Sequence, residues 1–123
     1  MKLRIFNNSI RLRLRQSEVT QLIAVGSVEG RLDFGVGSAL EYRLVADGDA
    51  SGTRVAFVVG EIRITVPKDV AHGWANGSDV TISANQDNSA GGLQILIEKD
   101  FQCLHKDDPS EADAYPNPML APN

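Results

Sequence analysis

Alternation of apolar and charged side chains across short turns most constrains what this chain can fold into. Residues 2–6 and 9–15 both alternate in this way, and Asn7-Asn8 separates them. Such alternation buries one face of a β-strand, and asparagine tolerates the left-handed backbone of a two-residue turn. The pattern therefore predicts a hairpin. Its expected cross-strand pairs are Lys2 with Arg13, Leu3 with Leu12, Arg4 with Arg11 and Ile5 with Ile10.

The same alternation predicts three more hairpins. They span residues 28–45, 54–66 and 79–101. In the first of these, the three-residue loop Gly35-Val36-Gly37 places Gly37 in the left-handed conformation and sets Arg31 opposite Glu41, a favourable cross-strand pair. The next turns at Val59-Gly60, and its turn type stays open because valine is poor at positive φ.

Two short helices are expected between the strands. Ser17 is a good N-cap for the first helix, which Gly26 ends. Pro67 is a favoured first residue for the second helix, which ends at Asn76-Gly77. No internal repeat is evident. The expected fold is mainly antiparallel β, of the α+β class, with about eight strands in four hairpins that form a barrel or a two-layer sheet.

Composition indicates one globular domain without a membrane helix. The chain has 123 residues, 42% of them hydrophobic, a net charge of −4 and one cysteine, Cys103. No apolar run approaches the roughly 20 residues of a membrane helix, and an acidic chain argues against a dedicated nucleic-acid binder. An unpaired cysteine fits a reducing cytoplasm. We expect a β-rich domain over residues 1–106 and an acidic, proline-rich tail over 107–123, packed on that domain or on a neighbouring chain.

The first hairpin also predicts a strongly basic face. Like charges directly opposite each other destabilise a strand pair, so they need compensation. Glu98 and Asp100, on one face of the last strand, are the expected ion-pair partners; the alternatives are a bound anion and plain solvation. We favour ion pairing or solvation over a ligand, because ion-pair networks are commoner than anion sites. The basic candidates are Lys2, Arg4, Arg11, Arg13 and Arg15.

No catalytic or cofactor site emerges from the motifs. The cluster with metal-ligand chemistry consists of Asp100, Cys103, His105, Asp107 and Asp108. One cysteine with one nearby histidine falls short of the three or four ligands of a zinc site, so Cys103 is interpreted as a small buried hydrophobe. The glycines form no phosphate-cradling loop. We therefore expect no catalytic residue, no metal and no cofactor.

Three stretches of the sequence resemble a family of small uncharacterised bacterial proteins. They are residues 8–26, which contain Asn-Ser-Ile-Arg-Leu-Arg-Leu followed by Ser-Glu-Val, residues 97–104, which read Ile-Glu-Lys-Asp-Phe-Gln-Cys-Leu, and the closing Pro116-Asn117-Pro118. The resemblance implies a bacterial, cytoplasmic, stand-alone domain and brings no activity with it.

The function stays unknown at this point, and two interpretations are open. The leading one is a non-catalytic cytoplasmic module that binds a protein partner or another copy of itself, with Tyr115, Pro116 and Pro118 of the tail as docking residues. The alternative is a small enzyme or sensor that binds an anionic, phosphate-bearing ligand on the basic face. Pairing of each arginine with an acid would count against the second interpretation, and an open hollow free of acids would favour it.

Overall fold

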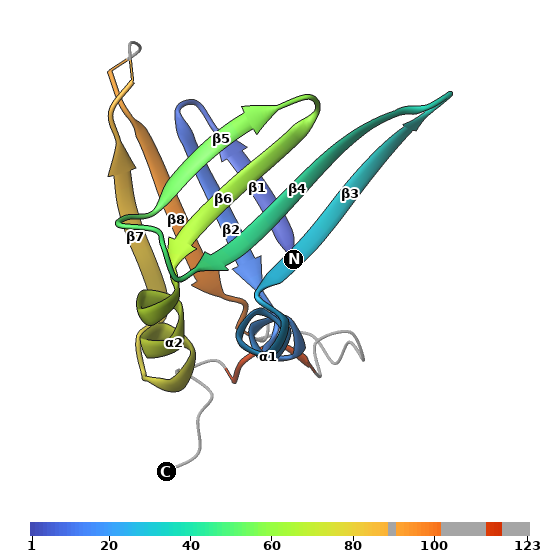
Figure 1. Cartoon of the computed structure of the whole chain (residues 1–123). Helices are drawn as coiled ribbons and strands as arrows, with labels where there is room; N and C mark the ends of the chain where they lie inside the picture. Colours follow the sequence, from blue (N-terminus) through green and yellow to red (C-terminus); the bar gives the residue numbers. More distant parts are fainter. Residues whose placement is uncertain (89–90, 102–112, 117–123) are drawn as a thin grey trace.

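The four hairpins form two four-stranded sheets, with both helices at the end opposite the hairpin loops (Figure 1). This computed structural model describes residues 1–88, 91–101 and 113–116. The elements are β1 (Lys2–Phe6), β2 (Ser9–Leu14), α1 (Gln16–Val25), β3 (Ser27–Gly35), β4 (Ser38–Asp47), β5 (Arg54–Val58), β6 (Glu61–Pro67), α2 (Lys68–Asn76), β7 (Thr81–Gln86) and β8 (Leu93–Lys99).

Each sheet consists of two antiparallel hairpins joined by a parallel pair of central strands. Sheet A has the order β1-β2-β8-β7 and sheet B the order β3-β4-β6-β5. The predicted α+β class with four hairpins is confirmed, and of the two predicted architectures the structure has the two-layer one. The alternation did not reveal the parallel pairs β2–β8 and β4–β6, because it specifies which face of a strand is buried and not which hairpin lies beside it.

The chain contains an internal structural repeat that is not evident in the sequence. Each half runs hairpin, helix, hairpin, and each half gives one hairpin to each sheet. The two halves therefore exchange hairpins. A short local similarity accompanies the repeat: β2 begins its core-facing run with Ile10-Arg11-Leu12, and β6 with Ile62-Arg63-Ile64. Short stretches of alternating type are too common in β proteins to signal a repeat without the structure.

The hydrophobic core lies between the two sheets and extends onto the helices. The side chains of Leu12, Leu44, Ile64, Ile95 and Ile97 are fully buried in it. They come from the four central strands β2, β4, β6 and β8, so the parallel pairs that the sequence did not reveal hold the centre of the core.

The two sheets are also linked by polar contacts. The Gln86 side chain on β7 accepts a hydrogen bond from the Val55 N–H at 2.7 Å and donates one to the Val55 carbonyl at 3.0 Å, which ties β7 to the edge of β5. The Tyr42 hydroxyl on β4 donates to the Met1 carbonyl at 3.0 Å. The Tyr42 ring lies across Gly30 on β3, where any Cβ atom would overlap it. A side chain at position 30 would therefore have to displace the Tyr42 ring.

The registers of the first three hairpins match the predictions, and one local detail differs. Arg4 pairs with Arg11 and Arg31 with Glu41, as predicted. The β3–β4 loop is shorter than expected: Val36 and Gly37 turn alone, with the register irregularity at residues 33–35. Both turn residues have positive φ, so the prediction for Gly37 is confirmed.

The predicted cap of the first helix is wrong. Arg15 is the N-cap residue of α1, and Ser17 is already inside the first turn. The Glu18 carboxylate accepts a hydrogen bond from the Arg15 N–H at 2.9 Å, so the backbone donor of the N-cap residue is satisfied. Gly26 ends α1 with φ of 98°, as predicted. Pro67 is the N-cap of α2 and not its first helical residue.

Candidate functional site

Sheet A carries the predicted basic residues on its outer face, and the structure divides them into two groups. Lys2 and Arg13 form one cross-strand pair, and Arg15 follows β2 toward the helix end of the sheet. Arg4 and Arg11 form the next pair, closer to the β1–β2 loop. The predicted set therefore does not converge on one point.

Acids lie beside residues of both groups. The Lys2 ammonium is 3.1 Å from Asp100, and the Nε atoms of Arg11 and Arg13 are 3.2 and 3.9 Å from the same Glu98 oxygen. One carboxylate thus faces two guanidinium groups. Arg4 has no hydrogen-bond or ion-pair partner among the described residues.

A hollow of about 370 Å³ lies on this face of sheet A and contains the second group. We call it the basic hollow. It holds two guanidinium groups and no carboxylate among its lining residues. Its lining consists of Arg4, Ile5, Phe6, Ser9, Arg11, Gln94 and Leu96.

Sheet B has a hollow of similar size, and there glutamates accompany the arginines. This second hollow, of about 320 Å³, is lined by Glu29, Gly30, Arg31, Glu41, Tyr42, Arg43 and Glu61. Its arginines pair closely with acids: Arg31 lies 2.6 Å from Glu41, and Arg43 lies 2.6 Å from Glu29. The two hollows thus differ in their lining: one combines arginines with glutamates, and the other has two arginines and no carboxylate.

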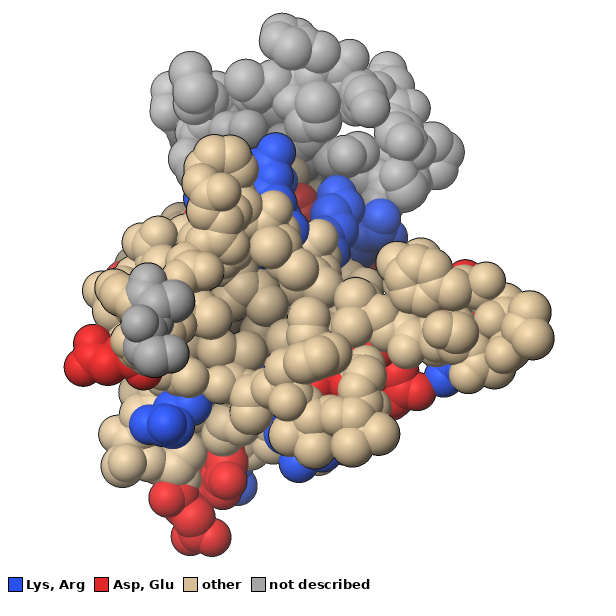
Figure 2. All heavy atoms as spheres, turned by 90° about the horizontal axis from the view of Figure 1, so that it is seen from above, with Lys and Arg blue, Asp and Glu red and all other residues tan. Residues whose placement is uncertain are grey.

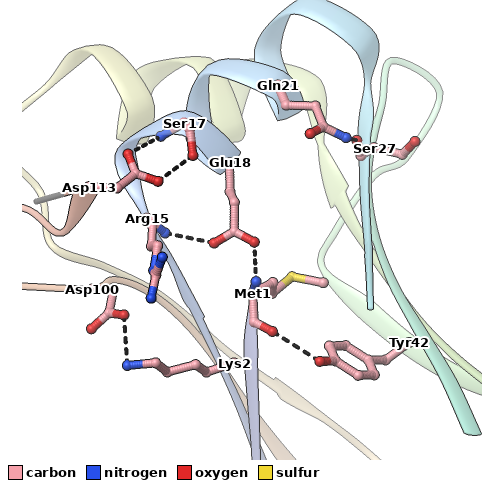
Figure 3. A network of polar contacts seen from close by, with 10 residues as sticks. All are labelled: Met1, Lys2, Arg15, Ser17, Glu18, Gln21, Ser27, Tyr42, Asp100 and Asp113. Carbon is pink, nitrogen blue, oxygen red and sulfur yellow. Dashed lines mark hydrogen bonds and ion pairs between the residues drawn. The ribbon is translucent and has the colours of Figure 1, made fainter. Parts of the chain in front are cut away.

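A network of polar contacts surrounds the N-terminus of α1 (Figure 3). The Asp113 carboxylate accepts hydrogen bonds from the Ser17 backbone N–H, at 3.0 Å, and from the Ser17 hydroxyl. The Met1 amino group donates to Glu18. Hydrogen bonds from the Ser17 hydroxyl and then from the Ser17 N–H lower the pKa of Asp113. Burial opposes them, and the Arg15 charge adds a still smaller lowering.

The described part of the tail contacts the body of the protein. The Tyr115 N–H donates to the Asp100 carbonyl at 2.6 Å, and the Tyr115 ring meets the Phe101 ring edge to face at 5.9 Å between centroids. The Lys99 ammonium, 5% exposed as a residue, lies 5.4 Å from the centroid of Tyr115 and 5.8 Å from that of Trp74. Burial first, and the Asp113 charge second, raise the pKa of Tyr115.

The tail predictions fall only partly on described residues. Tyr115 is half-buried and Pro116 is exposed, whereas Pro118 and most of residues 107–123 lie outside the described residues. So do Cys103, His105, Asp107 and Asp108, the predicted metal-type cluster apart from Asp100. Within the described ranges, no group of three His, Cys, Asp or Glu side chains is placed to hold a metal ion. Neither helix there has the length and apolar character to cross a membrane.

A feature that the sequence did not lead us to expect is the apolar end of the molecule. Three hairpin loops there expose large apolar side chains, which we call the hairpin end: Ile5, Leu32, Phe34, Val36, Phe57, Val58 and Val59. Figure 2, seen from this end, shows mostly uncharged residues over the centre and charged residues toward the margins. The sequence signal was present, because valine occupies the turn positions where asparagine or glycine is usual.

Comparison with known proteins gives a family and no function. A family model described as a family of unknown function (DUF7009) matches residues 1–119. No curated protein and no solved structure matches this chain.

Proposed function

The chain belongs to this family of unknown function, DUF7009, and we propose that it is a non-catalytic binding module that self-associates through its hairpin end. The observation that carries the proposal is the gathering of seven exposed apolar side chains on three loops at one end of the molecule. Monomeric proteins rarely expose contiguous apolar patches larger than a few hundred Å².

The exposed apolar side chains supply a large part of the area that a protein interface uses. Phe34 and Phe57 are 65% and 67% exposed, and Val36 and Val59 are exposed almost completely. An aromatic side chain buries roughly 150–250 Å² when it is covered. With the aliphatic residues included, the hairpin end offers several hundred Å², and a standard interface takes about 800 Å² from each partner.

The backbone conformation at the tips of the β3–β4 and β5–β6 hairpins indicates that the valine side chains there have a role. Val36 and Val59 have φ of 54° and 49°, a conformation that costs L-residues other than glycine and asparagine roughly 1–2 kcal/mol. Each is followed by a glycine, so an Asn-Gly turn would fit the same backbone with less strain. Strain of this kind is typical of functional positions, because the fold alone gains nothing from an exposed valine.

A second copy of the chain is the occupant that we propose. The β3–β4 hairpin projects away from the other hairpins (Figure 1). Because β6 pairs with β4 only from Glu41 onward, the tip of this hairpin, which we call the arm tip, extends beyond its sheet. The arm tip is apolar at Leu32 and Phe34, and the neighbouring loops are apolar at Ile5 and Phe57. One molecule thus carries both parts of a self-complementary interface, which a two-fold dimer requires.

The test is the oligomeric state of the chain and of a variant with altered tips. We expect wild-type protein to sediment as a dimer over a wide concentration range, and Val36→Asn/Val59→Asn to weaken the dimer by at least about 100-fold, because four valine side chains leave the interface. The matched control is Val25→Asn. Val25 is 73% exposed on α1, at the opposite end of the molecule.

Two outcomes would overturn the proposal. A wild-type chain that stays monomeric at every concentration excludes self-association, and the hairpin end would then be a site for a different protein. A dimer that survives the tip substitutions as well as it survives Val25→Asn places the interface elsewhere. A dimer lost in both variants would point to general destabilisation, which circular dichroism of each variant detects.

A further inference from the structure

We propose that the basic hollow on sheet A binds a small phosphate-bearing ligand that also carries a planar ring, of the mononucleotide type. The proposal concerns the outer face of sheet A and does not depend on self-association at the hairpin end. It starts from two arginines that the strand register forces together. Arg4 lies directly opposite Arg11 on neighbouring strands, an arrangement that destabilises the sheet unless an anion compensates it.

The described residues supply little of that compensation. Arg4 lines the hollow without any described partner, and Arg11 has Glu98 at 3.2 Å. Glu98 also lies 3.9 Å from Arg13, so one negative charge is divided between two guanidinium groups. Two arginines side by side thus keep most of their positive charge at the surface of the hollow.

The internal repeat provides a comparison within the same molecule. The hollow of sheet B holds Arg31 and Arg43, each 2.6 Å from a glutamate. Arg63, which occupies in β6 the position that Arg11 has in the similar stretch of β2, lies 2.9 Å from Glu61. In the same stretch Glu61 corresponds to Ser9, so an acid lines the hollow of sheet B where a serine lines the basic hollow.

The other lining residues fit a ligand of defined chemistry. The planar fork of arginine binds phosphate oxygens in a bidentate manner, and the exposed Gln94 amide adds donors beside it. Phe6 shares the outer face with Arg4 and is 74% exposed at the rim of the hollow. Aromatic side chains of this kind stack on planar rings. The volume of about 370 Å³ lies within the range of small-molecule sites.

The experiment titrates the full chain with adenosine monophosphate, ribose 5-phosphate and inorganic phosphate at low ionic strength, by calorimetry. We expect adenosine monophosphate to bind more tightly than ribose 5-phosphate or inorganic phosphate. Arg4→Gln and Arg11→Gln should each weaken it by at least tenfold, and Phe6→Ala should weaken the nucleotide while leaving ribose 5-phosphate unchanged. Arg63→Gln is the matched control, because it removes the same charge from the corresponding strand of sheet B.

Each outcome bears on a different part of the proposal. Equal weakening by Arg63→Gln would mean that the ligand senses only the overall charge, and it would overturn the site. Equal affinity for all three probes, unaffected by Phe6→Ala, would overturn the assignment of a ring-bearing ligand. No heat with any probe would overturn the proposal as a whole. Repeating the titration with Val36→Asn/Val59→Asn keeps the result independent of self-association.

Discussion

Val36 and Val59 combine two unfavourable properties at single residues. Both are β-branched residues at positive φ, and both are almost completely exposed to solvent. The first hairpin solves the same problem differently, because Asn7 takes the corresponding left-handed conformation with φ of 49°. Asparagine visits this region readily, since its short polar side chain forms local hydrogen bonds. The three loops therefore hold residues in the same backbone conformation, which is strained for Val36 and Val59 and unstrained for Asn7.

We expect Val36→Asn and Val59→Asn to raise the free energy of unfolding of the monomer by about 1 kcal/mol each, because asparagine relieves the left-handed strain. Urea denaturation at concentrations where the chain is monomeric measures this. The reverse change, Asn7→Val, should lower the free energy of unfolding by a similar amount. Stabilised tips that also lose self-association would show that the valines are retained for contact; tips that lose stability would contradict the strain argument.

The sequence predicted much at this scale. Alternation, together with the expected turns, placed Arg4 opposite Arg11 and led to the correct register for three hairpins. It did not predict that, of the five basic residues, Arg4 and Arg11 line the basic hollow, because the shape of that surface depends on how β1, β2 and β8 lie together in the folded chain. Cross-strand neighbours follow from local pattern, and the charges around them follow from tertiary structure.

At the scale of elements, α1 depends on residues far from it in the chain. Its first turn receives the Asp113 carboxylate at Ser17, and the Gln16 side chain donates to the Ala114 carbonyl at 3.0 Å. The prediction that a side-chain oxygen accepts a hydrogen bond at the start of this helix was right, but that oxygen belongs to Asp113 and not to Ser17. A carboxylate from position 113 caps the helix instead, and no local sequence signal identifies such a partner.

We expect Asp113→Asn to lower the melting temperature at neutral pH, because the amide gives up the charge that the helix N-terminus stabilises. The folded pKa of Asp113 is lowered from its usual 3.8, so its contribution is complete above that value and disappears as the pH falls through the folded pKa. The melting temperatures of wild type and variant should therefore converge in acid.

Asp69→Asn is the control for this prediction. Asp69 lies in the first turn of α2, so the control removes the same charge at the start of the other helix without a tertiary hydrogen bond. A difference between wild type and Asp113→Asn that persists unchanged below pH 3.8 would assign the effect to packing rather than to the ionised carboxylate.

At the scale of the whole molecule, the two sheets differ in how far apart their strands lie in sequence. Sheet B comes from the continuous segment between Ser27 and Pro67, whereas sheet A joins β1 and β2 to β7 and β8 from the other end of the chain. This is the part of the fold that periodicity does not reveal. Hairpins are local, and the parallel contact between β2 and β8 is decided by the completed core.

We expect sheet B to form before sheet A during refolding, because closing a longer loop costs more conformational entropy. Pulse-labelling hydrogen exchange should protect the amides of β4 and β6 earlier than those of β2 and β8. Simultaneous protection of both parallel pairs would contradict this order and indicate a single nucleus that spans the core.

The exchange of hairpins between the two halves has a consequence for how such a chain arises. Two identical copies of a hairpin–helix–hairpin segment, each lending one hairpin to the other, would form the same pair of sheets as an intertwined dimer. Fusing the copies into one gene frees each from the need to be symmetric. One sheet can then neutralise its outer face, as with Arg43 and Glu29, while its counterpart keeps Arg4 without an acid partner among the described residues. An origin by duplication would let one small domain carry two unlike surfaces on scaffolds of the same topology.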